Sequence, residues 1–253
     1  DAASLQDAYK EFASQVKGFL FVESNIPLKG IKYSVSEEAD FYIDGIRPNA
    51  SGSYFDLHTP DGIYKNQFFN QLGMHNLSNA LVALAMASKA GLLVEDLAES
   101  LASFPGVERR LQVLINEKNR ILIDDYAHHP TEIKAVYETL KLSFPADEKC
   151  VVFQPHLFSR TQDFMTDFAA VLSLFDRVLL LDIYPARELP IEGVSSGALK
   201  ELISGPSVEL VTKKELANRL SSVDERIIVL LGAGDIGLEV EGIKHKLLYD
   251  EAL

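Results

Sequence analysis

The sequence predicts an α/β protein in which a mainly parallel sheet, with helices on both faces, follows a region of antiparallel hairpins. Beyond Pro105-Gly106, apolar runs of strand length alternate with helical patterns, which is typical of a parallel sheet buried on both faces. Before that dipeptide, strand-like segments are separated by turn residues such as Asp61-Gly62. We therefore expect a boundary near residues 105–110, with domains at 1–107 and 108–253.

The first domain is expected to open with an amphipathic helix at 5–16 and a buried strand at 19–22. Four strand-like segments follow: "GIKYSV", "ADFYIDGI", "SGSYFDLHT" and "IYKNQFF". The period then changes in "HNLSNALVALAMASKAG", which has no internal Gly or Pro and ends at Gly91 as a helix does. A second helix is expected over "LVEDLAESLASF".

Four apolar runs in the second domain are expected to be its strands, at 120–123, 150–153, 177–181 and 226–231. The clearest helix between them starts at Pro130, since proline suits the first helical turn. Its apolar positions follow the i, i+3, i+4, i+7 spacing of a buried helix face. They are Ile133, Val136, Tyr137 and Leu140.

Composition limits the functional classes. The 24 Lys and Arg against 37 Asp and Glu give a net charge of −13, which argues against a nucleic-acid binder or an anionic-membrane binder. The lone Cys150 cannot form an intrachain disulfide and fits a reducing cytosol. No apolar run approaches the roughly 18 residues of a transmembrane helix. We therefore expect a cytoplasmic protein without membrane or nucleic-acid partners.

Polar or small residues follow each strand predicted in the second domain. In open α/β sheets, ligands bind beyond the carboxyl ends of the strands, so four such ends together predict a functional cleft. The residues are Asp124, Asp125, Tyr126, His128 and His129 after the first strand, Gln154, His156, Ser159 and Arg160 after the second, Asp182, Tyr184, Arg187 and Glu188 after the third, and "GAGDIG" after the fourth.

Several chemistries are compatible with these residues. Asp124, Asp125, His128 and His129 have the side chains of a metal site, which would indicate a metal-dependent hydrolase. "GAGDIG" matches a dinucleotide fingerprint, but the 253-residue chain leaves no room for the further strand and acidic residue that a nicotinamide site needs. A tight turn that lets a helix and a strand pack closely is the simpler interpretation.

Two further motifs have a structural and a functional interpretation. Arg109 and Arg110 stand at the predicted hinge, where they are either a solvated basic pair or an anion site. His75, Asn76 and Asn79 stand at the start of a predicted helix. Helix capping would explain one of these three residues but not all of them.

Five motifs, in this order, resemble the Mur ligases of bacterial cell-wall synthesis: "GMHNLSNALVA", "GVERRLQ", "DDYAHHPTEI", "FQPHLFSRT" and "DIYPARELPIEGVSS". The resemblance runs from about residue 18 to 240. It implies the rear part of a central ATPase domain followed by a Rossmann-like C-terminal domain. No GxxxxGK[ST] occurs in the 253 residues, so the P-loop, the main Mg²⁺ ligands and the UDP-binding domain are expected upstream of Asp1.

The resemblance also implies a reaction. Within the family, the motifs are most similar to those of members that join L-alanine to UDP-N-acetylmuramate. ATP phosphorylates the muramoyl carboxylate, and the amine of L-alanine attacks the acyl phosphate. We expect ATP and Mg²⁺ as cofactors and the two substrates as partners, together with the missing N-terminal and P-loop segments. The chain alone is expected to be inactive. A family member that recycles a tripeptide onto the same sugar nucleotide is the alternative.

Site residues are carried over from the resemblance position by position. His75, Asn76 and Asn79 match the motif that holds the adenine end of ATP, and Asp125 matches an aspartate that contacts the nucleotide. Arg110 matches an arginine that reaches the γ-phosphate, and with His128 it is assigned a catalytic role. The residues that match the pocket for the amino-acid and muramoyl carboxylates are Tyr126, His128, His129, His156 and Arg160.

Two departures from the family pattern concern charge near the carboxylates. Leu157 stands where an arginine is frequent, and Arg187 is an added cation. We hypothesise that Arg187 supplies, from the next strand end, the charge that is missing at position 157.

Overall fold

The computed structural model describes residues 2–249, without the side chains of residues 2–4. The chain divides between Pro105 and Gly106 into two compact units. Within the described residues, no helix is both long and apolar enough to cross a membrane.

The first unit contains a five-stranded sheet with the strand order β1-β2-β3-β4-β5. Only β3, β4 and β5 pair antiparallel, whereas β1 pairs with β2 and β2 with β3 in parallel. The predicted hairpins are present as β3-β4 and β4-β5, whereas β2, which was predicted among the hairpin strands, pairs with β3 in parallel. The elements are α1 (Ala2–Gln15), β1 (Phe21–Glu23), β2 (Ile31–Ser34), β3 (Phe41–Asn49), β4 (Gly52–Thr59), β5 (Gly62–Phe69), α2 (Met74–Lys89) and α3 (Val94–Ala102).

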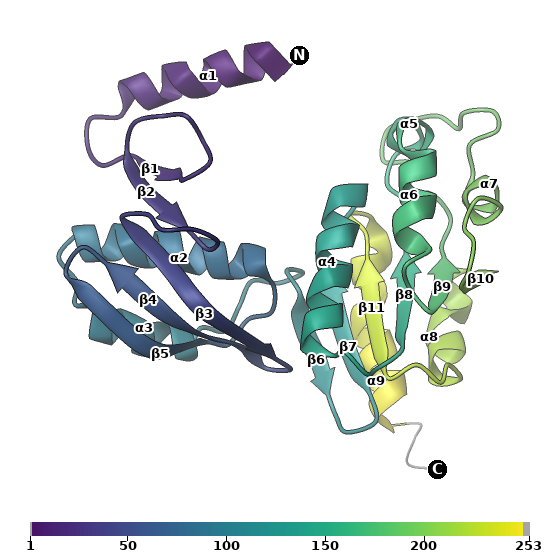
Figure 1. The fold of residues 1–253 in the computed structure, drawn as a ribbon. Coiled ribbons are helices and arrows are strands. Elements are labelled where there is room, and N and C mark those ends of the chain that lie inside the picture. Colours follow the sequence, from purple (N-terminus) through teal and green to yellow (C-terminus); the bar gives the residue numbers. More distant parts are fainter. Residues whose placement is uncertain (1, 250–253) are drawn as a thin grey trace. The chain divides into compact units, whose positions relative to one another are not determined.

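Helices α2 and α3 cover one face of this sheet (Figure 1). Leu77, Leu81 and Leu84 repeat at helical spacing along α2 and are buried against strand residues such as Phe41 and Leu57. Full burial of side chains of this size contributes about 1.5–3 kcal/mol each. The apolar face of α2 therefore holds the antiparallel strands together.

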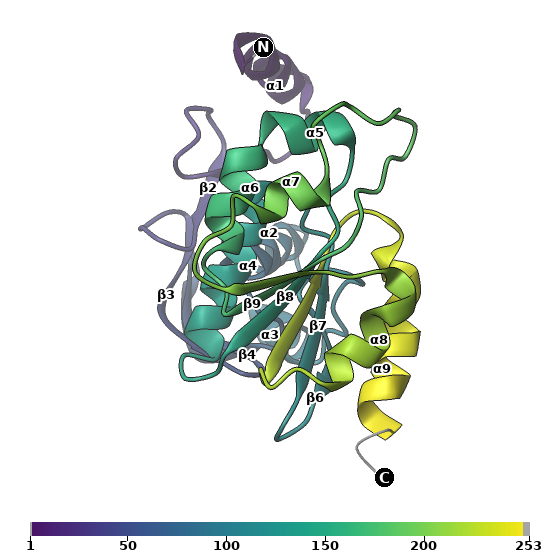
Figure 2. The same cartoon turned by 90° about the vertical axis from the view of Figure 1, so that its right-hand side faces the viewer.

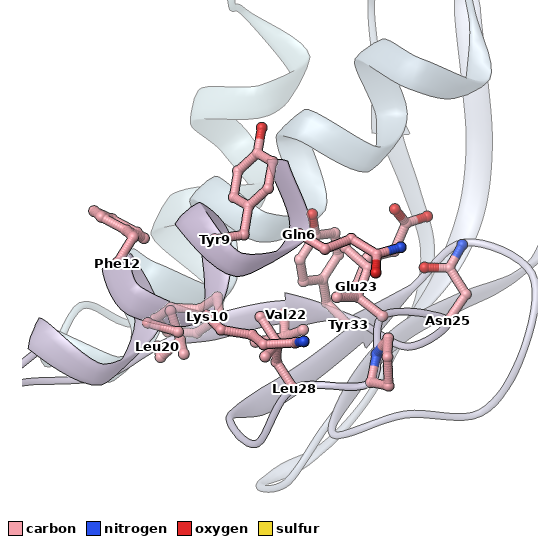
Figure 3. Close-up of a pocket in the computed structure, with 14 residues that line it drawn as sticks. Gln6, Tyr9, Lys10, Phe12, Leu20, Val22, Glu23, Asn25, Leu28 and Tyr33 are labelled. Atoms are coloured by element: carbon pink, nitrogen blue, oxygen red, sulfur yellow. The ribbon is translucent and has the colours of Figure 1, made fainter. Parts of the chain in front are cut away.

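A hollow of about 530 Å³ lies between α1 and the edge formed by β1 and β2 (Figure 3). Lys10 reaches from α1 toward Val22 and Leu28, while Tyr9 and Phe12 remain more than half exposed. Its lining is mainly apolar and contains none of the residues that the sequence predicts for the site.

The second unit contains a six-stranded sheet with the order β10-β9-β8-β11-β7-β6. All neighbours pair in parallel except β6, which is antiparallel to β7. The sequence did not predict β6 and β10. The elements are β6 (Gln112–Asn116), β7 (Ile121–Asp125), α4 (Pro130–Ser143), β8 (Lys149–Phe153), α5 (Phe158–Asp163), α6 (Met165–Leu172), β9 (Arg177–Leu180), α7 (Ser196–Lys200), β10 (Ser207–Leu210), α8 (Lys213–Ser221), β11 (Ile227–Leu231), η1 (Asp235–Glu239) and α9 (Val240–Tyr249).

Helices cover both faces of this sheet, as the apolar strands predict. Figure 2 shows α4 and α6 on one face and α8 and α9 on the other. Every residue of β7, β8 and β11 is buried. Because these strands are parallel, their carboxyl ends lie at the same edge of the sheet. This carboxyl edge is where the predicted site residues of the second unit lie.

Candidate active site at the carboxyl edge of the second sheet

Four rings from three strand ends form a row along the carboxyl edge. The ring centroids of Tyr126 and His128 are 5.5 Å apart, those of His128 and His156 are 6.1 Å apart, and those of His156 and Tyr184 are 5.7 Å apart. A parallel bridge between His156 and Tyr184 extends the pairing of β8 and β9 beyond the strands. The predicted residues that follow three separate strands thus meet at one place.

Arg160 adds a cation to this row. Its Nη1 lies 3.3 Å from Nδ1 of His156. Burial lowers the pKa of His156 below its usual value, and the charges of Arg160 and His128 lower it further. His156 is therefore neutral at pH 7. Since a guanidinium only donates, Nδ1 accepts from it and Nε2 carries the proton. His156 and Arg160 thus offer two donors to an anionic group.

His128 has the opposite arrangement of ring nitrogens. Its Nδ1 lies 2.9 Å from the carbonyl oxygen of Tyr126 and 3.5 Å from a carboxylate oxygen of Glu132. Both neighbours accept hydrogen bonds, so Nδ1 carries a proton. In the neutral ring, Nε2 then has a lone pair and is able to accept a proton.

His129 has a structural role in this arrangement. It is the N-cap of α4, where its Nδ1 accepts from the amide of Thr131 at 3.3 Å and Glu132 completes a capping box. Its ring packs edge-on against Phe164, with the centroids 4.6 Å apart. The ring therefore stands apart from the row, and its predicted contact with substrate stays a prediction.

The two aspartates at the carboxyl end of β7 are both held by groups of the protein. Asp125 is buried, and its two oxygens accept the amides of Leu111 and Ala127, each at 2.7 Å. Asp124 pairs with Arg109, Oδ2 to Nε, at 3.1 Å. A direct contact between Asp125 and a nucleotide is still only a prediction, whereas its hold on the backbone beside Arg110 is observed.

Arg109, which the sequence analysis names beside Arg110 without assigning it to the site, lies at this edge. Its guanidinium donates to Asp124 at 3.1 Å and to the carbonyl of Gly232 at 2.5 Å, and it lies 5.0 Å from the ring centroid of Tyr126. A Cβ on Gly237 would lie 2.9 Å from its Nη1. Arg109 therefore ties the ends of β7 and β11 to the first ring of the row. The adjacent "RR" pair was the available signal, but the prediction favoured Arg110.

Burial raises the pKa of Asp124, and the charge and hydrogen bond of Arg109 oppose this effect. One carboxylate oxygen of Asp124 is buried without a hydrogen-bond partner among the described residues. Arg109 therefore favours the ionised form of this carboxylate.

Arg110 is exposed and stands between two residues in the left-handed region, Arg109 at φ 56° and Leu111 at φ 46°. Leu157 at φ 73° and Ala186 at φ 50° lie in the loops after β8 and β9. Four of the five non-glycine residues with positive φ that the structure describes are thus at this edge. Such backbone costs about 1–3 kcal/mol per residue and clusters at functional sites.

The "GAGDIG" turn is filled by the protein's own side chains. A Cβ on Gly234 would lie 2.5 Å from Oε1 of Gln154 and 2.8 Å from Tyr184. Gln154 also accepts the amide of Ile236 at 2.9 Å and donates to Asp235 at 2.7 Å, while Lys213 pairs with Asp235. These contacts leave no space for a pyrophosphate at the turn. The glycines instead allow close packing, as the simpler interpretation predicts.

The geometry does not favour a metal site over "IDDYAHHP". Asp124, Asp125 and His129 each bind a different protein partner. In the part of the chain that the structure describes, no three His, Cys, Asp or Glu side chains are placed to hold a metal ion.

Three predicted residues lie in the first unit, at the start of α2. Gly73 is the N-cap, with φ 95°, so neither asparagine caps the helix. Asn76 donates from its side chain to the carbonyl of Leu72 at 2.8 Å, and His75 and Asn79 are exposed. Their contact with adenine stays a prediction. Arg187, in the second unit, is exposed, and its proposed compensation for Leu157 is also untested.

Comparisons with known proteins agree with this architecture. Residues 16–87 match the Mur ligase middle domain, and residues 109–234 match the Mur ligase glutamate ligase domain. The chain is 47% identical over 252 residues to UDP-N-acetylmuramate–L-alanine ligase of Christiangramia forsetii, covering 99% of the chain and 56% of that protein. It is 48% identical over 249 residues to the enzyme of the same name from Flavobacterium psychrophilum, covering 98% and 56%.

The crystal structure of UDP-N-acetylmuramate-alanine ligase MurC from Thermotoga maritima has the same fold. It superposes with a TM-score of 0.78 at 23% identity, over 100% of this chain and 56% of that protein. The chain thus spans about half the length of the relatives it matches. Both matching models describe domains of one family, and the chain belongs to the Mur ligases.

Proposed function

We propose that the chain is part of an ATP-dependent ligase that joins L-alanine to UDP-N-acetylmuramate through an acyl phosphate. The observation that carries this proposal is the row from Tyr126 to Tyr184 with Arg160 beside His156, which offers donors to a carboxylate. Two relatives at 47% and 48% identity bear the name of this ligase. We further propose that the reaction is cytoplasmic, which fits a single, unpaired cysteine.

Three rings of the row have a role in this proposal. Arg160 and Nε2–H of His156 hold a substrate carboxylate, and Tyr126 lines the same pocket. Nε2 of His128 accepts the proton that the L-alanine amine loses as its nitrogen bonds to the acyl carbon. Inorganic phosphate leaves as the amide forms, so atoms and charge balance.

Arg110 is proposed to stabilise the charge that develops on the transferred phosphoryl group. Its exposed side chain is free to reach an anion, and the left-handed residues on both sides hold its backbone in a fixed turn. His75, Asn76 and Asn79 are proposed to hold the adenine end of ATP. Mg²⁺ would bind mainly to residues upstream of Asp1, as the family resemblance implies, and would neutralise phosphate charge.

A chimera tests this proposal. The chain replaces the matching 56% of the Christiangramia forsetii ligase, and product is measured by mass spectrometry after incubation with ATP, Mg²⁺, L-alanine and UDP-N-acetylmuramate. We expect the L-alanyl sugar nucleotide and one ADP per product. A folded chimera that binds ATP but forms no product with L-alanine, glycine or serine would contradict the proposal.

A further inference from the structure

Glu188 is a charged residue next to the row to which neither the sequence nor the comparisons assign a role. It lies in the loop after β9, four residues beyond Tyr184. One carboxylate oxygen accepts the hydroxyl of Ser159 at 2.5 Å, and the other accepts the amide of Ser159 at 2.9 Å. The loop after β9 is thus bound to the first turn of α5 by two hydrogen bonds to one charged group.

The start of α5 depends on this contact. Its N-cap is Leu157, which has φ 73° and no side-chain acceptor for the first amides of the helix. Hydrogen bonds from the hydroxyl and then the amide of Ser159 lower the pKa of Glu188. Glu188 is therefore ionised at pH 7 and provides, from another loop, the acceptor that Leu157 lacks.

The two loops are also joined near His156. The amide of Leu157 donates to the carbonyl of Tyr184 at 2.9 Å, and the amide of Tyr184 donates to Pro155 at 2.8 Å. Residues 185–188 form a turn that follows Tyr184. It is closed by a hydrogen bond of 2.9 Å from the amide of Glu188 to the carbonyl of Pro185. The segment from Pro155 to Ser159, which contains His156, is therefore held at one end by Tyr184 and at the other by Glu188.

We infer that Glu188 is a positioning residue that holds Arg160 and His156 in the orientation in which they receive a substrate carboxylate. Arg160 follows Ser159 directly, so the backbone that Glu188 fixes is the one that aims the guanidinium. Each oxygen of Glu188 accepts a hydrogen bond from Ser159, so the carboxylate acts on Arg160 through the backbone of the preceding residue. The identity of the carboxylate rests on the proposed function, whereas the positioning role does not.

The first test uses the 253-residue chain and needs no activity. The ring nitrogens of ¹⁵N-labelled His156 are observed by NMR at pH 7, with the signal assigned from a His156→Gln variant. In the wild-type chain we expect one neutral tautomer with the proton on Nε2. In Glu188→Ala we expect the two nitrogen shifts to move toward each other, because Nδ1 loses its fixed donor. Glu192→Ala is the matched control, since Glu192 is an exposed glutamate in the same loop.

The second test measures kinetics in the chimera. For Glu188→Ala we expect the KM for L-alanine to rise about tenfold, the effect of losing an oriented charge-assisted hydrogen bond, while the KM for ATP stays unchanged. Glu188→Gln keeps an oxygen that accepts from Ser159 and should return the KM for L-alanine to within about threefold of wild type. A residue that only stabilised the fold would lower the amount of active protein and leave KM unchanged.

The outcomes separate the two proposals. If the wild-type chimera forms no product, the proposed function fails and the NMR measurement still decides the positioning role. If Glu188→Ala does not fold, Ser159→Ala replaces it. The KM for L-alanine should then rise about threefold, because the hydroxyl bond to Glu188 is lost and the amide bond remains. Wild-type ring shifts in Glu188→Ala would overturn the inference. So would a Glu188→Gln variant with the same KM as Glu188→Ala, since charge would then matter rather than position.

Discussion

The arginines at the two ends of the six-stranded sheet differ in their partners and exposure. At the amino end, Arg177 donates to both oxygens of Glu225 at 2.8 and 2.9 Å and to Glu209 at 3.0 Å, and Arg219 also binds Glu209. At the carboxyl edge, Arg110 and Arg187 are exposed, and Arg160 contacts a neutral histidine. These charges at the amino end are paired within the protein, whereas the carboxyl edge has, beside the Arg109–Asp124 pair, cations that are exposed.

The backbone conformation also differs between the two ends of the sheet. The residues Arg109, Leu111, Leu157 and Ala186 adopt left-handed conformations at the carboxyl edge. Near the amino end, the positive φ at 205 belongs to a glycine, which adopts it without strain. The ion pairs at the amino end predict effects on stability, and the exposed cations at the carboxyl edge predict effects on activity, so variants of these two groups should differ.

The largest effect is expected for Arg110→Ala. If Arg110 stabilises developing charge on the phosphoryl group, kcat in the chimera should fall about 10²–10³-fold while the melting temperature is unchanged, because the side chain is exposed. Lys118→Ala, which removes an exposed cation from the turn between β6 and β7, is the matched control. Equal kcat in both variants would remove Arg110 from the mechanism.

Glu225→Ala should affect stability instead. It leaves the guanidinium of Arg177, which is 19% exposed, without its two-bond partner, and we expect about 3 kcal/mol of destabilisation in urea unfolding. Steady-state KM values of the folded chimera should be those of wild type. Glu201→Ala, at an exposed glutamate, should cost less than about 0.5 kcal/mol. A changed KM for L-alanine in Glu225→Ala would show that the ion pairs at the amino end also affect substrate binding.

Arg109→Met should cost about 2 kcal/mol at pH 7, because it leaves the buried Asp124 carboxylate unpaired. The pKa of Asp124 in the folded state is already raised above 3.8 by burial, so the folded state binds the proton more readily than the unfolded state. Stability from this group therefore falls as pH rises from 3.8 through the raised pKa. Removing Arg109 raises the pKa of Asp124 further, so the loss of stability then continues to higher pH.

The pH dependence is best measured as a difference between two proteins. The gap in melting temperature between wild type and Arg109→Met should narrow when the pH is lowered from 7 to 5, since loss of Arg109 raises the pKa of Asp124 further and the variant then binds the proton more readily than wild type. A gap that is constant or widens on acidification would show that Arg109 does not act through Asp124.

In the six-stranded sheet, the sequence predicts the central strands better than the two edge strands. Continuous apolar runs gave β7, β8, β9 and β11 because these strands are buried on both faces. Strands β6 and β10 were missed because they are short, partly exposed and carry polar residues. Their side-chain pattern is that of a loop, and only pairing with a neighbour makes them strands.

The site shows the same limit. Residues after the strands were predicted because parallel strands end at one edge. The contact between Asp125 and the amide of Leu111 was not predictable, since the sequence does not show that these residues, 14 positions apart, meet. Glu188 was noted after its strand without a role, because its partner Ser159 lies 29 positions away. Long-range pairing decides which polar residue serves the fold and which remains available to a ligand.

The central claim is that the carboxyl edge binds a substrate carboxylate. The KM for L-alanine of Arg160→Met in the chimera tests it most directly, because Arg160 is the cation proposed to hold this carboxylate. We expect it to rise at least about tenfold, with the KM for ATP and the melting temperature close to wild type. An unchanged KM for both L-alanine and UDP-N-acetylmuramate would contradict the claim that this edge binds the substrate carboxylates.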